Sequence, residues 1–303
     1  MSDGTESHHF AIAEFHVEIA FAPSAHNSIR LLPSLQPFAT DASGSEADIR
    51  LTVDDQLKPI PRNRRTRMGN FDTGNGHIVV DKVDGEQGGY QYIVKDTDDT
   101  SCCLLQTSPD FRENHCALAG SYNHRTFGLN NALMLCFAFA TSFHSTLLIH
   151  ASLIRKEGLG YAFTAKSGTG KSTHTSLWLK HIEGSDLMND DNPIIRIKEG
   201  TPYIYGSPWS GKTPCYRNIK ARLGAIVQID RAKQNSIDRL TPTGAFAVML
   251  PACSTMKWDK PTFDGICNTI STLISTTSIY MLHCLPDEEA ARICHKTIAK
   301  NPA

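Results

Sequence analysis

Hydrophobic and polar residues roughly alternate through the N-terminal part of the chain, a period that predicts half-buried β-strands. The first such run covers residues 9–21 and is expected to be one strand. Further strands are expected at 49–53, 77–83, 90–95 and 101–106. Turn residues separate them, and the turn at 84–89 is consistent with a hairpin. These strands predict a β-rich N-terminal domain over residues 1–124. Because no catalytic constellation stands out in it, the domain is expected to recognise a substrate.

From about residue 125 the hydrophobic pattern becomes that of alternating helices and strands. Residues 127–146 are apolar enough for a buried helix, and 147–154 are expected to form a strand that turns at 157–160. A strand at 160–164 and a helix after residue 173 follow. The remaining strands are expected at 184–188, 194–198, 202–205 and 223–229, and the helices near 243–250, 263–277 and 287–300. The pattern predicts an α/β nucleotide-binding domain over 125–303.

Composition and charge restrict the class of protein. The chain has 303 residues, of which 40% are hydrophobic and 20% charged, as in a globular protein. A formal net charge of −1 gives no global field for binding nucleic acid or an anionic membrane, so neither is expected as a partner. One local exception, four arginines within residues 62–67, is interpreted as a solvated loop. The apolar region 129–149 contains Asn, Ser and His, which favours a buried helix over a membrane span.

Cysteine usage and the N-terminus indicate a reducing compartment. The nine cysteines are an odd number without a C-x-x-C pair, and several lie among apolar residues. Buried free thiols explain this pattern better than a disulfide framework. Residues 1–9 are polar and acidic, unlike a signal peptide. We therefore expect a cytoplasmic protein.

The strongest motif is AKSGTGKST at residues 165–173, between an apolar strand and an expected helix. This order of strand, glycine-rich turn and helix is the context of a phosphate-binding loop, or Walker A motif. Its amides and the helix N-terminus can face phosphate oxygens, while Lys171 adds a positive charge and Ser172 a hydroxyl for Mg²⁺. Ala165 stands where the motif usually has glycine, and the alternative is a Ser/Gly turn before an ordinary helix. The residues expected to bind the nucleotide are Ser167, Gly168, Thr169, Gly170, Lys171, Ser172 and Thr173.

Three acidic or basic residues near this motif are candidates for chemistry. Asp190 and Asp191 follow the next expected strand, which should place them beside the loop. One carboxylate can hold Mg²⁺ with Ser172, and the other can accept a proton from an attacking hydroxyl. The alternative is an Asx-rich turn, because Asn-Asp-Asp-Asn-Pro is also good turn chemistry. His150 lies on the expected partner strand and is either a catalytic residue or a hydrogen-bonded core histidine.

His150-Ala151-Ser152, the motif at 165–173 and Asp190-Asp191 together resemble the superfamily of HPr kinase/phosphorylase and ATP-dependent phosphoenolpyruvate carboxykinase. The resemblance covers about residues 127–240. It implies an α/β fold in which a P-loop kinase domain of this type follows the smaller β-rich domain. It also implies that His150 supports catalysis, that Asp190 is the general base, and that Asp191 and Ser172 lie near the divalent ion. A homo-oligomer and the reverse reaction, phosphate attacking phosphoserine, are compatible with the family.

The sequence departs from that family at three places. Thr173 stands where HPr kinases typically have Glu, and Asn189 where they usually have a small apolar residue. The Glu-Ile-Arg-Gly-Leu-Gly signature is absent. The segment 205–218 in its place is similar to HPr-kinase-related proteins, whose acceptors differ from HPr.

The segment 206–217 contains further candidates for contacts with substrate. Lys212 or Arg217 is expected to neutralise charge on the transferring phosphoryl group, and Trp209 to pack on nucleotide or acceptor. The alternative is a turn stapled by a buried tryptophan.

The sequence thus predicts an ATP-dependent kinase that uses Mg²⁺, or Mn²⁺ in its place, and phosphorylates a hydroxyl. The expected acceptor is a serine of a peptide or protein, or a small hydroxyl compound. Asp190, His150 and Lys171 are the expected catalytic residues, with Ser172 and Asp191 at the metal. Two alternatives remain open, a nucleotide-binding regulatory module without transfer and a phosphoenolpyruvate carboxykinase.

Overall fold

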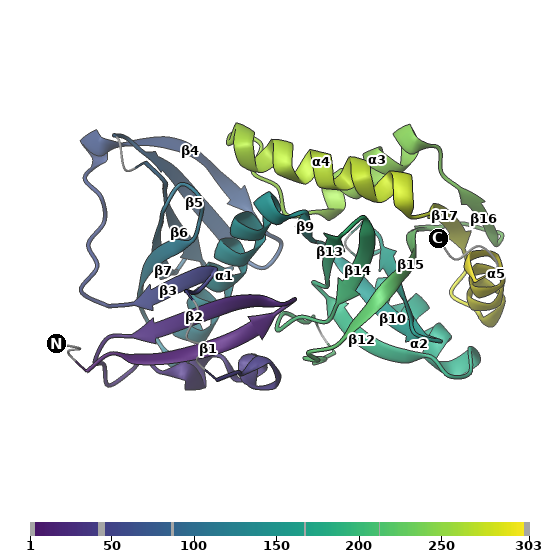
Figure 1. Ribbon diagram of the computed structural model, residues 1–303, viewed down its shortest axis with the longest axis horizontal. Coiled ribbons are helices and arrows are strands. Elements are labelled where there is room, and N and C mark those ends of the chain that lie inside the picture. The colour runs from purple at the N-terminus through teal and green to yellow at the C-terminus, as the bar shows by residue number, and fades with distance from the viewer. Residues whose placement is uncertain (1–3, 42–45, 86–87, 167, 212, 300–303) are drawn as a thin grey trace. The chain divides into compact units, whose positions relative to one another are not determined.

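The computed structural model describes residues 4–41, 46–85, 88–166, 168–211 and 213–299 (Figure 1). The chain is a mixed α/β protein that divides into two compact units, Met1–Ala140 and Thr141–Ala303, each with its own sheet. The division falls later than the boundary expected between residues 124 and 125. The reason is the helix α1 (Tyr122–Thr141), nearly all of which belongs to the first unit.

The first unit contains an eight-stranded sheet in the order β1-β2-β3-β8-β7-β6-β5-β4. Its strands are β1 (Glu6–Ile12), β2 (Phe15–Phe21), β3 (Ile49–Val53), β4 (Arg65–Asp72), β5 (His77–Val83), β6 (Tyr90–Lys95), β7 (Ser101–Thr107) and β8 (Glu113–Leu118). Short 3₁₀ helices occur at Ile29–Leu31, Pro33–Phe38 and Arg62–Arg64.

Helix α1 packs closely on this sheet. Gly128 leaves no room for a side chain, since a Cβ there would lie 2.8 Å from the carbonyl oxygen of Cys102 on β7. Phe137 meets Phe15 edge-on, with ring centroids 5.9 Å apart. These contacts explain why the helix belongs to the first unit, and its buried face confirms the expected core helix.

Two expectations for the first unit were wrong in detail. The single strand expected at 9–21 is the hairpin β1–β2, because Ala13 and Glu14 both adopt positive φ (48° and 66°) and form its turn. The arginine run is not a solvated loop throughout, since Arg65 and Arg67 lie on β4 and both bind the buried carboxylate of Asp81.

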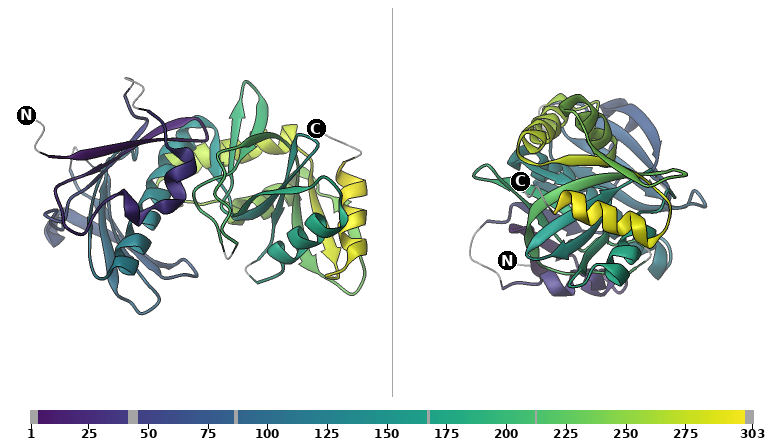
Figure 2. Two further views of the ribbon diagram at one scale, coloured as in Figure 1. Left: turned by 90° about the horizontal axis from the view of Figure 1, so that it is seen from below. Right: turned by 90° about the vertical axis from the view of Figure 1, so that its right-hand side faces the viewer.

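The second unit has helices on both faces of a nine-stranded sheet (Figures 1 and 2). Helices α3 and α4 cover one face, around buried Ile195 and Ile266, and helices α2 and α5 cover the other, around buried Phe163 and Cys294. The helices are α2 (Lys171–His181), α3 (Pro242–Ala252), α4 (Lys260–Thr276) and α5 (Glu288–Ile298), with a 3₁₀ turn at Ser142–His144. The strands are β9 (Thr146–Leu148), β10 (Ala151–Lys156), β11 (Leu159–Thr164), β12 (Asp186–Asp191), β13 (Ile194–Lys198), β14 (Thr201–Tyr205), β15 (Lys220–Arg231), β16 (Ser236–Arg239) and β17 (Ile279–Cys284).

The order of strands brings three segments to one edge of this sheet. Strand β10 is antiparallel to both β11 and β12 and lies between them, so β11 and β12 run in the same direction. Ala151, at the start of β10, is opposite Thr164 on one side and Asp191 on the other. The end of β11, the end of β12 and the residue before β10, His150, therefore share one edge.

A β-bulge interrupts the pairing of β10 with β12. Leu153 is opposite Asn189, but Ile154 is opposite Leu187, which leaves Met188 as an extra residue on β12. Such a bulge changes the register from one end of a strand to the other.

The strand expected at 147–154 is two strands in different parts of the sheet. Strand β9 pairs with β13 and β10 with β11, so the chain leaves one and enters the other at residues 149–150. Between the two strands, the backbone N–H of His150 donates to the carbonyl of Ala252, the last residue of α3, at 2.7 Å. The histidine thus lies on a connection rather than within a strand.

Two expectations from composition can be compared with the structure. All nine cysteines are free thiols, as expected, and eight of them are buried. In the described part of the chain one helical segment, Tyr122–His144, is long and apolar enough to cross a membrane, but 61% of its apolar window is buried, as in a core helix.

Candidate functional site

The loop between β11 and α2 has the backbone that a phosphate-binding turn needs. Gly168 and Gly170 have φ of 75° and 123°, values that favour glycine. Beyond its two chain neighbours, no atom of the described residues lies within 4 Å of where a Cβ on Gly168 would stand, so the loop is open on that side. Helix α2 begins at Lys171 without a side-chain cap, and its first N–H groups have no partner within the helix. Ser167 lies outside the described residues.

A chain of polar contacts joins this loop to β12. Lys171 Nζ lies 2.7 Å from His150 Nε2, and His150 Nδ1 lies 3.0 Å from Asp191 Oδ1. An ammonium can only donate hydrogen bonds, so Nε2 is the acceptor and Nδ1 carries the ring proton. His150 therefore donates to Asp191 and accepts from Lys171.

Asp190 makes a separate set of contacts. Its Oδ1 accepts hydrogen bonds from Ser152 Oγ at 2.6 Å and from Ser172 Oγ at 3.2 Å. Asp190 is only 5% exposed, whereas Asp191 is half-buried. The loop hydroxyl therefore donates to the first carboxylate of the pair.

Two opposing electrostatic effects act on the pKa of Lys171. Its burial lowers the pKa of the ammonium, because the charged form is poorly solvated. The carboxylates of Asp191 and Asp190 act in the other direction and raise the pKa, but the net shift is downward. An anionic ligand at the loop would add to the stabilisation of the charged form.

Oxygen atoms converge where a magnesium ion would be expected. Among the described residues no group of three or more His, Cys, Asp or Glu is arranged to hold a metal. Mg²⁺ rarely needs such a cage, because it binds one or two carboxylates and completes its shell with water and substrate phosphates. Ser172 and Asp190, whose oxygens are 3.2 Å apart, fit that requirement.

The structure describes two of the three candidates in 206–217, Trp209 and Arg217. Trp209 is 2% exposed, as expected for the alternative of a buried tryptophan that staples a turn. Arg217 binds Asp186 Oδ2 at 2.7 Å and also contacts the carbonyl of Leu187. Asp186 begins β12 and Asp191 ends it, so Arg217 is bound at the end of the strand away from the acid pair. Lys212 lies outside the described residues.

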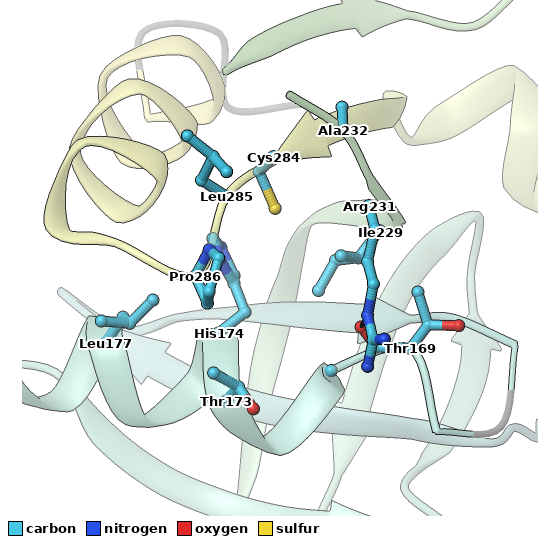
Figure 3. Close-up of a pocket in the computed structure, with 11 residues that line it drawn as sticks. Thr169, Thr173, His174, Leu177, Ile229, Arg231, Ala232, Cys284, Leu285 and Pro286 are labelled. Atoms are coloured by element: carbon cyan, nitrogen blue, oxygen red, sulfur yellow. Dashed lines mark hydrogen bonds between the residues drawn. The ribbon is translucent and has the colours of Figure 1, made fainter. Parts of the chain in front are cut away.

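A cavity of about 450 Å³ lies beside the loop (Figure 3). Thr169, Gly170 and Thr173 line it from the loop and α2. Leu177 of α2 also lines it, and the rest of the lining includes Ile229, Ala232, Cys284, Leu285 and Pro286, so that much of the wall is apolar. Arg231 extends from the end of β15 to the loop and donates to the carbonyls of Thr169 at 3.0 Å and Gly168 at 2.6 Å.

His174, also in the wall of this cavity, is a core residue. It is 2% exposed, and its Nε2 accepts a hydrogen bond from Trp178 Nε1 at 3.1 Å. Burial lowers the pKa of its imidazole to about 4, because the charged ring would lose its hydration. It is therefore neutral at pH 7.

Sequence reasoning missed three contributors to the site: Ser152, Asn189 and Arg231. In the sequence Ser152 is only the third residue of a motif and Asn189 only a departure from a family, and Arg231 belongs to no motif. Serine and asparagine occur in strands for many reasons, so the sequence alone does not mark them as parts of a site. Only the register of β10 with β12 shows which residues they contact.

Neither a protein-family model nor a curated protein matches the chain. Among solved structures, the chain is similar to the HPr(Ser) kinase/phosphatase from Coxiella burnetii. The match has 9% sequence identity and a TM-score of 0.30, and it covers 51% of this chain and 94% of that chain.

Proposed function

We propose that this chain is an ATP- and Mg²⁺-dependent kinase that transfers the γ-phosphoryl group to a hydroxyl, with a serine of a peptide or protein as the acceptor. The observation that carries the proposal is the convergence of the glycine loop, Lys171, His150 and the acid pair at one edge of a sheet. The resemblance of the three sequence motifs supports the choice of a kinase of the HPr kinase type, with a P-loop domain in the second unit.

In this proposal the nucleotide binds at the loop and in the cavity beside it. The amides of the loop and the N-terminus of α2 would bind the phosphates, with Lys171 as the cation. The largely apolar cavity lined by Leu177, Ile229 and Pro286 is large enough for the nucleoside end of ATP.

The contacts support a division of labour between the two aspartates that differs from the one implied by family resemblance. Because Asp190 is next to Ser172, we propose that these two would hold Mg²⁺, or Mn²⁺ in its place. The ion, when bound, would neutralise charge on the phosphates. Asp191 holds the imidazole of His150 with its Nδ1 protonated. Once Lys171 turns to a phosphate, Nε2 of His150 would be free to take the proton of the acceptor hydroxyl.

Three variants test the function and this division together. Transfer of labelled phosphate from ATP into candidate peptides and small hydroxyl compounds would be compared with ATP binding by calorimetry. His150→Gln and Asp191→Asn are expected to lose at least ~100-fold in transfer while still binding MgATP. Asp190→Asn is expected to lose the Mg²⁺ dependence of ATP binding as well.

Each contrary result has a distinct meaning. If Asp190→Asn abolishes transfer but binds MgATP as tightly as the wild type, Asp190 is the base and the contact-based division is wrong. If the wild type binds ATP but shows neither transfer nor hydrolysis with Mg²⁺ present, a nucleotide-binding regulatory module replaces the kinase.

A further inference from the structure

The amide of Asn189 joins the acid pair to the segment 207–211. We infer that Asn189 is a positioning residue, which holds this segment against Asp190 and Asp191 and so fixes where the two carboxylates stand. This inference rests on the proposed function, because it concerns the geometry of the same site.

Asn189 uses its whole hydrogen-bonding capacity within the core. It is 0% exposed. Its Oδ1 accepts from the backbone N–H of Asp191 at 3.1 Å and of Asn192 at 2.9 Å. Its Nδ2 donates to the carbonyl of Trp209 at 3.0 Å and to Ser207 Oγ at 3.2 Å.

These partners determine which way the amide points. A backbone N–H can only donate and a carbonyl can only accept, so the oxygen must face β12 and the nitrogen must face the segment 207–211. Ser207 extends the junction, because its hydroxyl also donates to the carbonyl of Asn192 at 2.6 Å. The end of β12 and this segment are thus joined through two side chains.

The same segment also lies directly against the acid pair. The N–H of Gly211 donates to the carbonyl of Asp190 at 2.6 Å, and Ser210 forms an isolated β-bridge with Asp191. A Cβ on Gly211 would be 2.7 Å from that carbonyl oxygen. The contact is therefore close enough that movement of 207–211 must move the backbone of the two aspartates.

Two variants test the two side chains that join β12 to the segment, Asn189 and Ser207, one at a time. Asn189→Asp keeps an oxygen for the two N–H groups but turns a carboxylate oxygen toward the carbonyl of Trp209, where a donor is needed. Ser207→Ala removes one partner on the segment, the Ser207 hydroxyl, and leaves the amide and its contact with the carbonyl of Trp209 in place. Asn268→Asp, at an exposed position of α4, makes the same chemical change as a control.

Three measurements on the full chain report the result. Hydrogen exchange would follow the amides of 207–211, calorimetry would measure ATP binding without metal, and Mg²⁺-dependent ATP hydrolysis would give kcat. Asn189→Asp is expected to accelerate exchange at 207–211 and to lower kcat ~100-fold, since small misplacements of catalytic groups have effects of that size. The affinity of Asn189→Asp for ATP without metal should stay within about threefold of the wild-type value, because the loop at 168–170 binds the phosphates through contacts that do not involve Asn189. Ser207→Ala should shift the same two readouts in the same direction, and Asn268→Asp neither.

Several outcomes would overturn the inference. It fails if Asn189→Asp keeps the wild-type kcat, whether or not exchange at 207–211 changes. If Asn189→Asp does not fold, Ser207→Ala decides, and an unchanged kcat in that variant overturns the inference in the same way. A wild type that does not bind ATP overturns the proposed function instead, which the calorimetry shows independently of both variants.

Discussion

Lowering the pH should destabilise the second unit through one buried histidine. His174 is enclosed between α2 and the sheet, and its pKa of about 4 lies below the ordinary value of 6.5. The unfolded chain therefore binds more protons than the folded one between these two values. The stabilising contribution is complete above pH 6.5 and is lost as the pH falls toward 4.

The size of the effect follows from the two pKa values. Linkage gives a loss of about 2 kcal/mol in the free energy of unfolding between pH 7 and pH 5, and about 3 kcal/mol when the titration is complete. That is a large part of the ~5–15 kcal/mol typical of a folded protein. Urea unfolding in metal-free buffer at the two pH values would measure it. The three tryptophans, Trp178, Trp209 and Trp258, all lie in the second unit, so their fluorescence reports on that unit.

His174→Gln is the matched variant. Its side-chain oxygen can still accept from Trp178 Nε1, but it does not titrate. The other titrating groups are shared by both proteins, so the difference between their pH-dependent losses isolates the histidine. The reasoning is refuted if the variant loses as much stability between pH 7 and pH 5 as the wild type does.

Three further predictions concern the loop and its neighbours. Lys171→Met should weaken ATP binding by calorimetry at least ~10-fold, because a charge-assisted contact is worth more than 1.4 kcal/mol, and equal affinity would exclude the loop as the phosphate site. Gly211→Ala should lower kcat for ATP hydrolysis ~10-fold or more, since its Cβ would displace the carbonyl of Asp190, and an unchanged kcat would show that the acid pair tolerates the shift. Arg231→Ala should speed hydrogen exchange at 168–170 and weaken ATP binding several-fold by releasing two loop carbonyls, and unchanged exchange would show that the loop holds its shape unaided.

Some strands of this fold could be predicted because the sequence pattern that determines them lies within the strand and its flanking turns. Strands β3, β5, β6 and β13 begin and end at the predicted residues, since each is a short hydrophobic run between turn residues. The hairpin β1–β2 could not be predicted, because its turn at Ala13-Glu14 has positive φ without glycine or asparagine.

The candidate site shows the same limit. The proximity of the loop to the acid pair was predicted from their order along the chain, and the hydrogen bond from Ser172 to Asp190 agrees with it. The partners of Arg217 could not be predicted. Which end of β12 it meets depends on the path of the segment after β14, and no local pattern encodes that path.

The bulge at Met188 has a consequence for how this sequence can change over evolutionary time. At one end of β12, Asp190 is opposite Ser152, and at the other, Asp186 is opposite Arg155, with one residue too many between them. Each end therefore keeps its own alignment. The bulge therefore separates the ion pairs of Asp186 with Arg155 and Arg217 from the pairing that holds the two aspartates beside the loop. Deletion of Met188 would remove the bulge and leave one continuous ladder, in which Asp190 would still lie opposite Ser152 and Asp186 opposite Arg155.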